Sequence, residues 1–152
     1  MKITAYDLAQ RFVGQPEIAG TSSNPLVLAM LRLEDPSVQD DAVPWCSAFV
    51  NFVCWLLRVP RSKSLSARSW LAIGRPIPLI EARPGWDVVV FSRGTGQQPG
   101  PEVLKAPGHV AFYAGAEGGV ILALGGNQGD VVNVSRYPME RLLGVRRLYE
   151  EA

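Results

Sequence analysis

The sequence has few residues of the types that carry redox or metal chemistry: its 152 residues include one histidine and two cysteines. Cys46 and Cys54 are eight positions apart on one predicted helix, so their Cα atoms are expected about 12 Å apart, beyond disulfide reach. We therefore expect two free thiols, which suits a reducing compartment at synthesis. Because these thiols and the single histidine cannot converge on one ion, we expect no metal site, and no cofactor is required.

The sequence also lacks an excess of charge and any long apolar run. Fifteen basic residues against fourteen acidic ones give a net charge of +1, which argues against a nucleic-acid partner. No segment approaches the roughly twenty apolar residues of a membrane span, and the N-terminus has no visible signal peptide. We expect a protein that is cytoplasmic at synthesis. A hydrophobic content of 47% without low-complexity segments predicts a single domain over residues 1–152.

Helices are predicted in the first half of the chain and strands in the second half. Capping residues, apolar stripes and Gly or Pro stops predict helices over about 5–13, 25–34, 44–58 and 66–73. Short β-rich runs separated by Gly and Pro follow, over 77–80, 86–91, 109–114, 120–124, 131–134 and 145–149. This order predicts an α+β fold whose antiparallel sheet of five to six strands packs on the helices. The stretch 92–108 is predicted to be a surface loop.

The predicted helix 44–58 carries a cysteine in its first turn. Asp40 and Asp41 precede it, and Pro44 suits the first helical position, where its missing N–H costs nothing. Unpaired N–H groups and the helix dipole favour a thiolate there, so Cys46 is a candidate nucleophile. The alternative is a small buried core residue. Cys54 lies two turns further along the helix and is expected to be an inert core thiol.

The single histidine, His109, opens a predicted strand directly after Gly108. If Gly118 and Gly119 form a two-residue hairpin turn, His109 faces Gln128 and lies next to Asn127. A one-residue bulge would instead place Asn127 opposite His109. In either register a carboxamide can accept a hydrogen bond from one imidazole nitrogen and leave the other free to take a proton from a thiol. The alternative is a histidine with a surface or core role.

Five short segments follow one another along the chain in a recognisable order. They are Pro-Trp-Cys-Ser-Ala-Phe-Val-Asn at 44–51, Ser-Leu-Ser-Ala-Arg-Ser-Trp at 64–70, Pro-Gly-Trp-Asp-Val-Val-Val-Phe at 84–91, Gly-His-Val-Ala-Phe-Tyr at 108–113 and Leu-Gly-Gly-Asn-Gln at 124–128. In this order they resemble the CHAP and NlpC/P60 papain-like cysteine peptidases. The resemblance spans about residues 9–147, and it is closest to a compact CHAP-like family of bacteria and their tailed phages.

The resemblance implies a papain-like fold and cleavage of an amide bond in peptidoglycan. The bond is either the one between sugar and stem peptide, cut by an amidase, or one within the peptide, cut by an endopeptidase. Cys46 matches the nucleophile, His109 the general base and Asn127 the residue that orients the histidine. The sequence departs from many CHAP domains at Gly125, where an acidic residue is common. Glu17, after the first helix, is a candidate replacement.

Four residues are candidates for substrate contact: Trp45, Trp70, Gln128 and Glu17. Aromatic side chains can line a groove for sugar or stem peptide, although large aromatics more often belong to the core. The loop 35–43 is a candidate for one rim of that groove, and its alternative is an ordinary solvated loop.

Three roles are compatible with the resemblance. A phage lysin or bacterial cell-wall hydrolase would act at the wall or periplasm after lysis, or after delivery by a holin or a secretion machine. An interbacterial amidase toxin would be injected into competitors and accompanied by an immunity protein. A domain that keeps the fold without catalysis would serve in wall binding or in the virion. The sequence leaves open the bond cut, the wall type and the oligomeric state.

Overall fold

The structure, a computed structural model, describes residues 2–18 and 23–150. Three α-helices come first, followed by a 3-10 helix and then by strands and two short 3-10 turns. The helices are α1 (Ala5–Gln10), α2 (Pro25–Glu34), α3 (Cys46–Leu57) and the 3-10 helix η1 (Ala67–Ala72). The strands are β1 (Arg75–Ile77), β2 (Asp87–Ser92), β3 (Gly108–Glu117), β4 (Val120–Gly125), β5 (Asn133–Pro138) and β6 (Leu142–Arg147). The predicted α+β order is confirmed.

The starts of α1 and α2 follow the sequence signals. Thr4 and Asp7 form a capping box in which each side chain accepts from the other residue's backbone N–H. Asn24 caps α2 by accepting the N–H of Leu26, and Pro25 takes the first helical position. Since α1 ends at Gln10, the predicted extent to residue 13 was too long. The segment predicted as a helix over 66–73 is a 3-10 helix.

Helix α3 begins two residues later than predicted, at Cys46, and Trp45 is its N-cap without a side-chain hydrogen bond. Pro44 therefore precedes the helix instead of starting it. Every residue from Cys46 to Asn51 is buried. The helix ends at Leu57, and its C-cap residue Arg58 adopts a left-handed conformation with φ of 57°. The cysteine thus occupies the first helical position, where backbone N–H groups have no partner within the helix.

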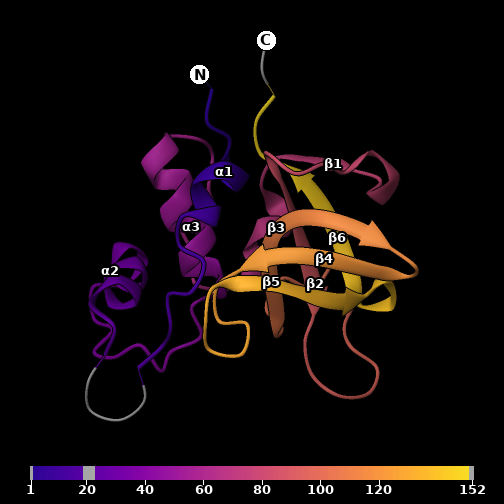
Figure 1. Cartoon of the computed structure of the whole chain (residues 1–152). Helices are drawn as coiled ribbons and strands as arrows, with labels where there is room; N and C mark the ends of the chain where they lie inside the picture. The colour runs from indigo at the N-terminus through magenta and orange to yellow at the C-terminus, as the bar shows by residue number, and fades with distance from the viewer. Residues whose placement is uncertain (1, 19–22, 151–152) are drawn as a thin grey trace.

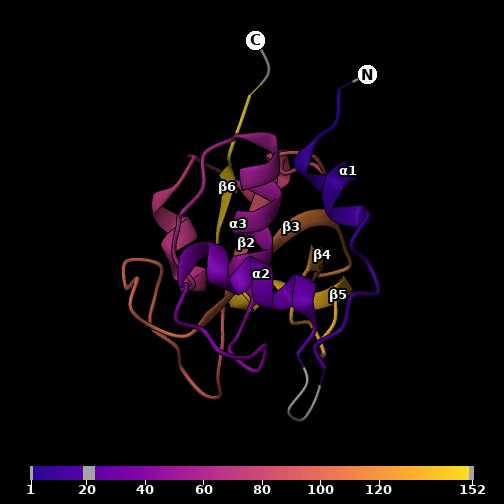
Figure 2. The same ribbon diagram turned by 90° about the vertical axis from the view of Figure 1, so that its left-hand side faces the viewer.

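The six strands form one antiparallel sheet in the order β1-β6-β2-β3-β4-β5. Helices α1, α2 and α3 lie on one side of the sheet, with α2 crossing in front of α3 in the second view (Figures 1 and 2). Alternate residues divide the apolar core into two clusters. One contains α3 with Val88, Val90, Val110 and Phe112, and the other covers the opposite face with Val89, Phe91, Ala111 and Tyr113.

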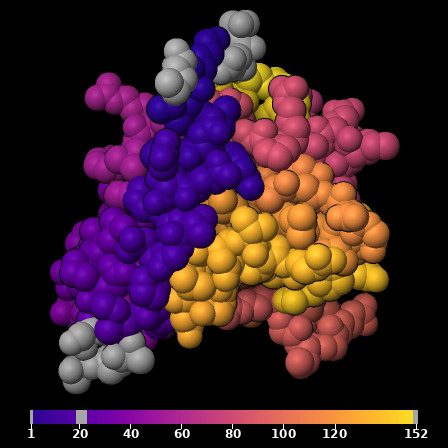
Figure 3. Space-filling view, in the orientation of Figure 1, coloured from indigo at the N-terminus to yellow at the C-terminus, as the bar shows by residue number. Residues whose placement is uncertain are grey.

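The N-terminal segment reaches the edge of the sheet near β4 and β5 (Figure 3). Pro16 forms an isolated bridge with Val131, and the Glu17 backbone N–H donates to the carbonyl of Asp130 at 2.7 Å. The segment joining α1 to α2 therefore lies beside the loop joining β4 to β5. Within the described residues, no helix is long and apolar enough to span a membrane.

The hairpin between β3 and β4 turns at Gly118 and Gly119, as predicted, and both glycines have positive φ. The pairing runs from Glu117 with Val120 to Gly115 with Leu122, and then shifts by one residue between Tyr113 and Gly115. The predicted one-residue bulge is therefore present. The shifted register would place Asn127 opposite His109, but β4 ends at Gly125 and the pairing does not extend that far.

Candidate active site

The start of α3 meets the start of β3, and this contact brings Cys46 near His109. Cys46 is 3% exposed. A hydrogen bond with the backbone of Val110, the residue after His109, acts to lower the pKa of its thiol. The backbone N–H groups of Cys46 itself and of Ser47 also favour the thiolate. The structure thus places Cys46 beside the backbone of the residue that follows His109.

Burial nevertheless raises the pKa of the Cys46 thiol above its usual value. The Val110 and α3 backbone groups and the positive charge of Arg93 act in the opposite direction but do not outweigh burial. The expected resting thiolate is therefore not what the structure favours: Cys46 rests as a neutral thiol. Cys54 is fully buried, and burial raises its pKa to about 12. This agrees with the inert role predicted for Cys54.

His109 is 6% exposed, and its Nε2 lies 2.9 Å from Oε1 of Gln128. The orientation of the Gln128 amide is fixed because its nitrogen donates to two carbonyl oxygens, those of Ala123 and Asn133. Oε1 is then an acceptor, so His109 Nε2 must carry the ring proton and donate it. The lone pair of the neutral imidazole is consequently on Nδ1, the nitrogen available to accept a proton from a thiol.

Tyr137 completes the surroundings of the histidine. Its ring stacks on His109 with centroids 5.2 Å apart and on Phe91 at 4.4 Å, and its hydroxyl donates to Gln128 Oε1 at 3.0 Å. Burial, together with the nearby charges of Arg93 and Arg141, lowers the pKa of His109 to about 4, against the opposing effect of the Gln128 hydrogen bond. The imidazole is therefore neutral at pH 7 and held in one plane. Tyr137 has no obvious signal in the sequence.

The residue that orients His109 is Gln128, where the resemblance implied Asn127. β4 ends at Gly125 before the shifted register reaches residue 127, and Asn127 itself adopts a left-handed conformation with φ of 58°. The chain leaves the β4 pairing at this turn. The side chain of the next residue, Gln128, contacts the imidazole of His109 and donates to the Ala123 carbonyl of β4. Gln128 is 5% exposed, and its side chain bonds to protein groups. The substrate contact predicted for it is therefore not supported.

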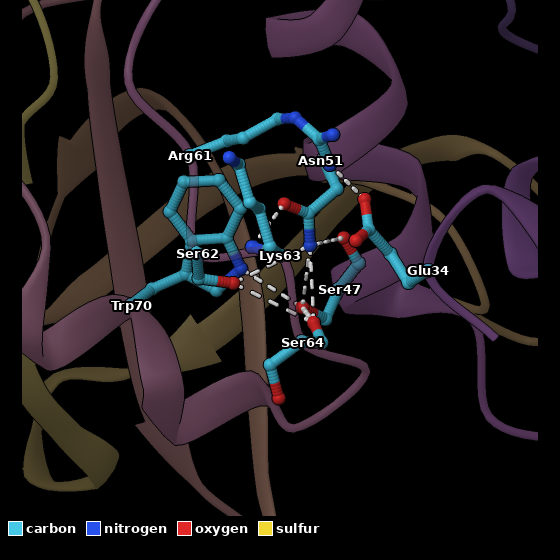
Figure 4. Close-up of polar contacts among 8 residues, drawn as sticks. All are labelled: Glu34, Ser47, Asn51, Arg61, Ser62, Lys63, Ser64 and Trp70. Carbon is cyan, nitrogen blue, oxygen red and sulfur yellow. Dashed lines mark hydrogen bonds and ion pairs between the residues drawn. The ribbon is translucent and has the colours of Figure 1, made fainter.

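A buried polar cluster holds the first turns of α3 against the segment that follows the helix (Figure 4). Ser47 Oγ donates to the Ser64 carbonyl at 2.6 Å and accepts from Trp70 Nε1 at 2.9 Å. Asn51 Nδ2 also donates to the Ser64 carbonyl, and Asn51 Oδ1 accepts the backbone N–H of Lys63. Trp70 is fully buried within this cluster. Its predicted contact with substrate is not supported, because the ring anchors the residue next to Cys46.

Trp45 and Glu17 occupy the opposite side of the α3 N-terminus. Trp45 is fully buried and packs against Gly126, where an added Cβ would lie 2.6 Å from the indole ring. The ring belongs to the core, contrary to the predicted substrate contact. Burial and the adjacent carboxyl of Asp130 raise the pKa of Glu17. Glu17 therefore pairs with the β4–β5 loop and does not replace the residue that orients His109.

The loop 35–43 is not simply solvated, because Asp41 is buried within it. Its Oδ2 accepts the backbone N–H groups of Ile18 at 3.0 Å and Asn24 at 2.8 Å. Asp41 thereby ties the segment before α3 to Ile18 and Asn24, which both belong to the connection between α1 and α2. Its role in the structure is to fix the chain around the start of α3.

Comparison with known proteins shows the fold. No protein-family model matches the chain, and no curated protein matches it. Among solved structures, NlpC1 from Trichomonas vaginalis superposes with a TM-score of 0.56 at 18% identity, over 97% of this chain and 44% of that one. An NlpC/P60 family protein from Bacillus cereus gives 0.54 at 19% identity, over 95% and 39%.

The P60 domain of an antigen from M. avium subspecies paratuberculosis matches across nearly its whole length. Its TM-score is 0.53 at 21% identity, with 97% of this chain and 96% of that chain covered. By contrast, this chain spans less than half of the Trichomonas and Bacillus proteins. The resemblance stated from the sequence is thus confirmed at the level of the fold: the chain has the NlpC/P60 papain-like architecture.

Proposed function

We propose that this protein hydrolyses an amide bond of peptidoglycan with Cys46 as nucleophile. The observation that carries the proposal is the His109–Gln128 pair, whose fixed tautomer leaves the imidazole lone pair on Nδ1, in the residue next to the Val110 backbone that Cys46 contacts. This is the arrangement of nucleophile, base and orienting group that acyl transfer requires. The fold of the NlpC/P60 proteins supports it, and so does the sequence resemblance to wall-cleaving peptidases of the CHAP and NlpC/P60 group.

The chemistry follows from a resting pair in which both groups are neutral. His109 Nδ1 takes the thiol proton as the Cys46 sulfur attacks the amide carbonyl carbon, which forms a carbon–sulfur bond. In this proposal the backbone N–H of Cys46, at the first position of α3, stabilises the oxyanion. The imidazolium then gives its proton to the leaving amine as the carbon–nitrogen bond breaks. Water, deprotonated by the same imidazole, hydrolyses the thioester and restores the thiol.

The resting state also explains why Gln128 and Tyr137 are needed. Because the His109 pKa is about 4, the imidazole is a weak base, and its proton transfer depends on orientation more than on basicity. The Gln128 hydrogen bond and the stacked Tyr137 ring fix that orientation. A phage lysin or bacterial cell-wall hydrolase is the role we assign, with peptidoglycan as the partner.

The test is digestion of purified, cross-linked peptidoglycan, with mass spectrometry of the released fragments. The wild type should release fragments whose new ends name the bond, and Cys46→Ala should release none. Cys54→Ala is the matched control, because it removes a thiol of the same helix that is remote from His109, and it should retain activity. Equal release by the wild type and Cys46→Ala would remove Cys46 from the mechanism.

A second candidate, a domain that keeps the fold without catalysis, is favoured by one observation. The Cys46 thiol is 3% exposed and its pKa is raised by burial, as for a structural cysteine. The same digestion separates the two functions. A wild type that releases nothing from walls of several chemical types would establish the silent domain.

A further inference from the structure

Three arginines without a carboxylate partner gather around the loop of residues 93–107. In the described part of the chain, Arg61, Arg75 and Arg147 each pair with a carboxylate. Arg68, Arg93 and Arg141 form no such pair within residues 2–18 and 23–150. The loop that they surround joins β2 to β3 and extends beyond the sheet at the bottom of Figure 1.

Arg68 is the fixed charge of this group. It is 0% exposed, and its guanidinium donates only to backbone carbonyls of the loop: Nη1 to Pro99, Gly100 and Val103, and Nε to Pro107. Nη2 is buried without a hydrogen-bond partner. Carbonyl dipoles solvate this cation but do not neutralise it. The loop is therefore shaped around a buried positive charge.

Arg141 lies on the other side of the same loop and lines a hollow of about 440 Å³. Its Nε and Nη2 both donate to the carbonyl of Ser92, at 3.1 and 2.7 Å, which fixes the guanidinium and leaves Nη1 unbound. Pro99 and Gly100, whose carbonyls bind Arg68, also line this hollow, so Arg68 lies directly behind its wall. The remaining lining residues are Ser92, Gly94, Gly96, Gln97, Gln98, Glu140 and Leu143.

The hollow adjoins the candidate active site through the β2–β3 pairing. Phe91 is the Cα partner of His109, and Ser92, at the wall of the hollow, is the partner of Gly108. Ser92 is thus one position along the paired strands from His109, and the two side chains alternate to opposite faces of the sheet. The charge of Arg93, next to Ser92, also reaches the site, since it lowers the pKa of both Cys46 and His109.

We propose that this hollow, in which Arg141 is the one lining arginine among the described residues, is a substrate subsite that binds a free carboxylate of the stem peptide close to the cleaved amide. Guanidinium groups recognise carboxylates through paired charge-assisted hydrogen bonds, and Arg141 is already held in place by Ser92. Arg93 and the buried Arg68 add positive potential. Glu140, an exposed residue that also lines the hollow, disfavours an anion. The three arginines together carry more positive charge than Glu140 carries negative charge. The proposal rests on the proposed function and determines which stem peptides the enzyme accepts.

The test compares two disaccharide tetrapeptides that differ only at the glutamyl α-carboxyl, free in one and amidated in the other. Cleavage by the wild type is measured as kcat/KM, and binding to Cys46→Ala is measured by NMR titration. We expect the free carboxylate to be preferred by about 10- to 100-fold in both measurements. Arg141→Gln and Arg93→Gln should each reduce this ratio. Arg93 forms no hydrogen bond with the part of the chain that the structure describes, so Arg93→Gln tests the subsite even if Arg141→Gln fails to fold.

Arg136→Gln is the matched control, because Arg136 is an exposed arginine of β5 outside the hollow, and it should leave the ratio unchanged. Equal cleavage and equal binding of the two substrates would overturn the subsite while leaving the hydrolase intact. A ratio retained in both arginine variants would also overturn it, as would no binding of either substrate. A binding preference without any cleavage by the wild type would support the subsite and refute the hydrolase.

Discussion

At the scale of single residues, the tautomer of His109 depends on Gln128. Replacing Gln128 with Ala removes the acceptor of the Nε2 proton and lets the imidazole rotate or change tautomer. We expect Gln128→Ala to lower kcat on peptidoglycan fragments by about 100-fold, since loss of an orienting group typically costs 10- to 100-fold or more. KM should change little, because the hydrogen bonds of the Gln128 side chain are made with protein groups.

The neighbouring position provides the control for this experiment. Asn127→Gly suits the backbone φ of 58°, which glycine adopts without strain, and it removes the carboxamide that the resemblance implied as the orienting group. Its kcat should stay within about 3-fold of the wild type, well under the factor of ten that corresponds to 1.4 kcal/mol. Circular dichroism verifies that both variants fold. If Asn127→Gly lost as much activity as Gln128→Ala, the orienting role would return to Asn127.

At the scale of elements, the position of the α3 N-terminus depends on the buried cluster around Ser47. Ser47→Ala leaves Trp70 Nε1 without its acceptor inside the core and also removes the donor to the Ser64 carbonyl. An unsatisfied buried polar group costs about 1–3 kcal/mol, so we expect the free energy of unfolding to fall by about 2–3 kcal/mol. Urea unfolding at pH 7 measures this change.

Ser69→Ala is the control for Ser47→Ala. It also deletes a serine hydroxyl bonded to a backbone carbonyl, that of Ser66 at 2.6 Å, but at an exposed place. Its effect should stay within about 0.5 kcal/mol. Similar, small losses for both variants would show that the cluster does not hold α3.

The elements that could be predicted from sequence are those with local causes. The capping box at Thr4 and the Asn24–Pro25 start of α2 are decided by side chains within one turn of the helix end. The turn at Gly118 and Gly119 is equally local. The choice between Gln128 and Asn127 is not local, because it depends on where β4 stops pairing and on the conformation that follows Gly125. Sequence periodicity carries no information about either.

At the scale of the whole molecule, the layering was predictable and the burial of the site was not. Helices followed by strands implied a sheet packed on a helical layer, which the structure and the NlpC/P60 fold confirm. The resting charge of Cys46 was predicted from its helix position alone, whereas burial is set by residues distant in sequence. The neutral thiol and the neutral imidazole are therefore properties of the assembled fold, and they have a consequence for stability.

Stability should fall in acid because His109 is buried in its neutral form. Its pKa is about 4 in the folded protein and about 6.5 when unfolded, so below pH 6.5 the unfolded state binds the extra proton. The contribution of neutral His109 is present in full above pH 6.5 and is lost progressively as the pH falls to 4. A difference of about 2.5 units corresponds to about 3 kcal/mol in the free energy of unfolding, and most of it should be lost by pH 4.

The measurement is urea unfolding of the wild type and His109→Gln at several pH values from 7 to 4. Other titrating groups, including Glu17, are common to both proteins, so the difference between the two curves isolates His109. We expect the wild type to lose about 3 kcal/mol more than the variant across this range. Parallel curves would mean that His109 is as accessible to protons in the folded protein as in the unfolded one. A water-accessible imidazole of ordinary basicity would then serve as the base, and catalysis would depend less on its orientation by Gln128.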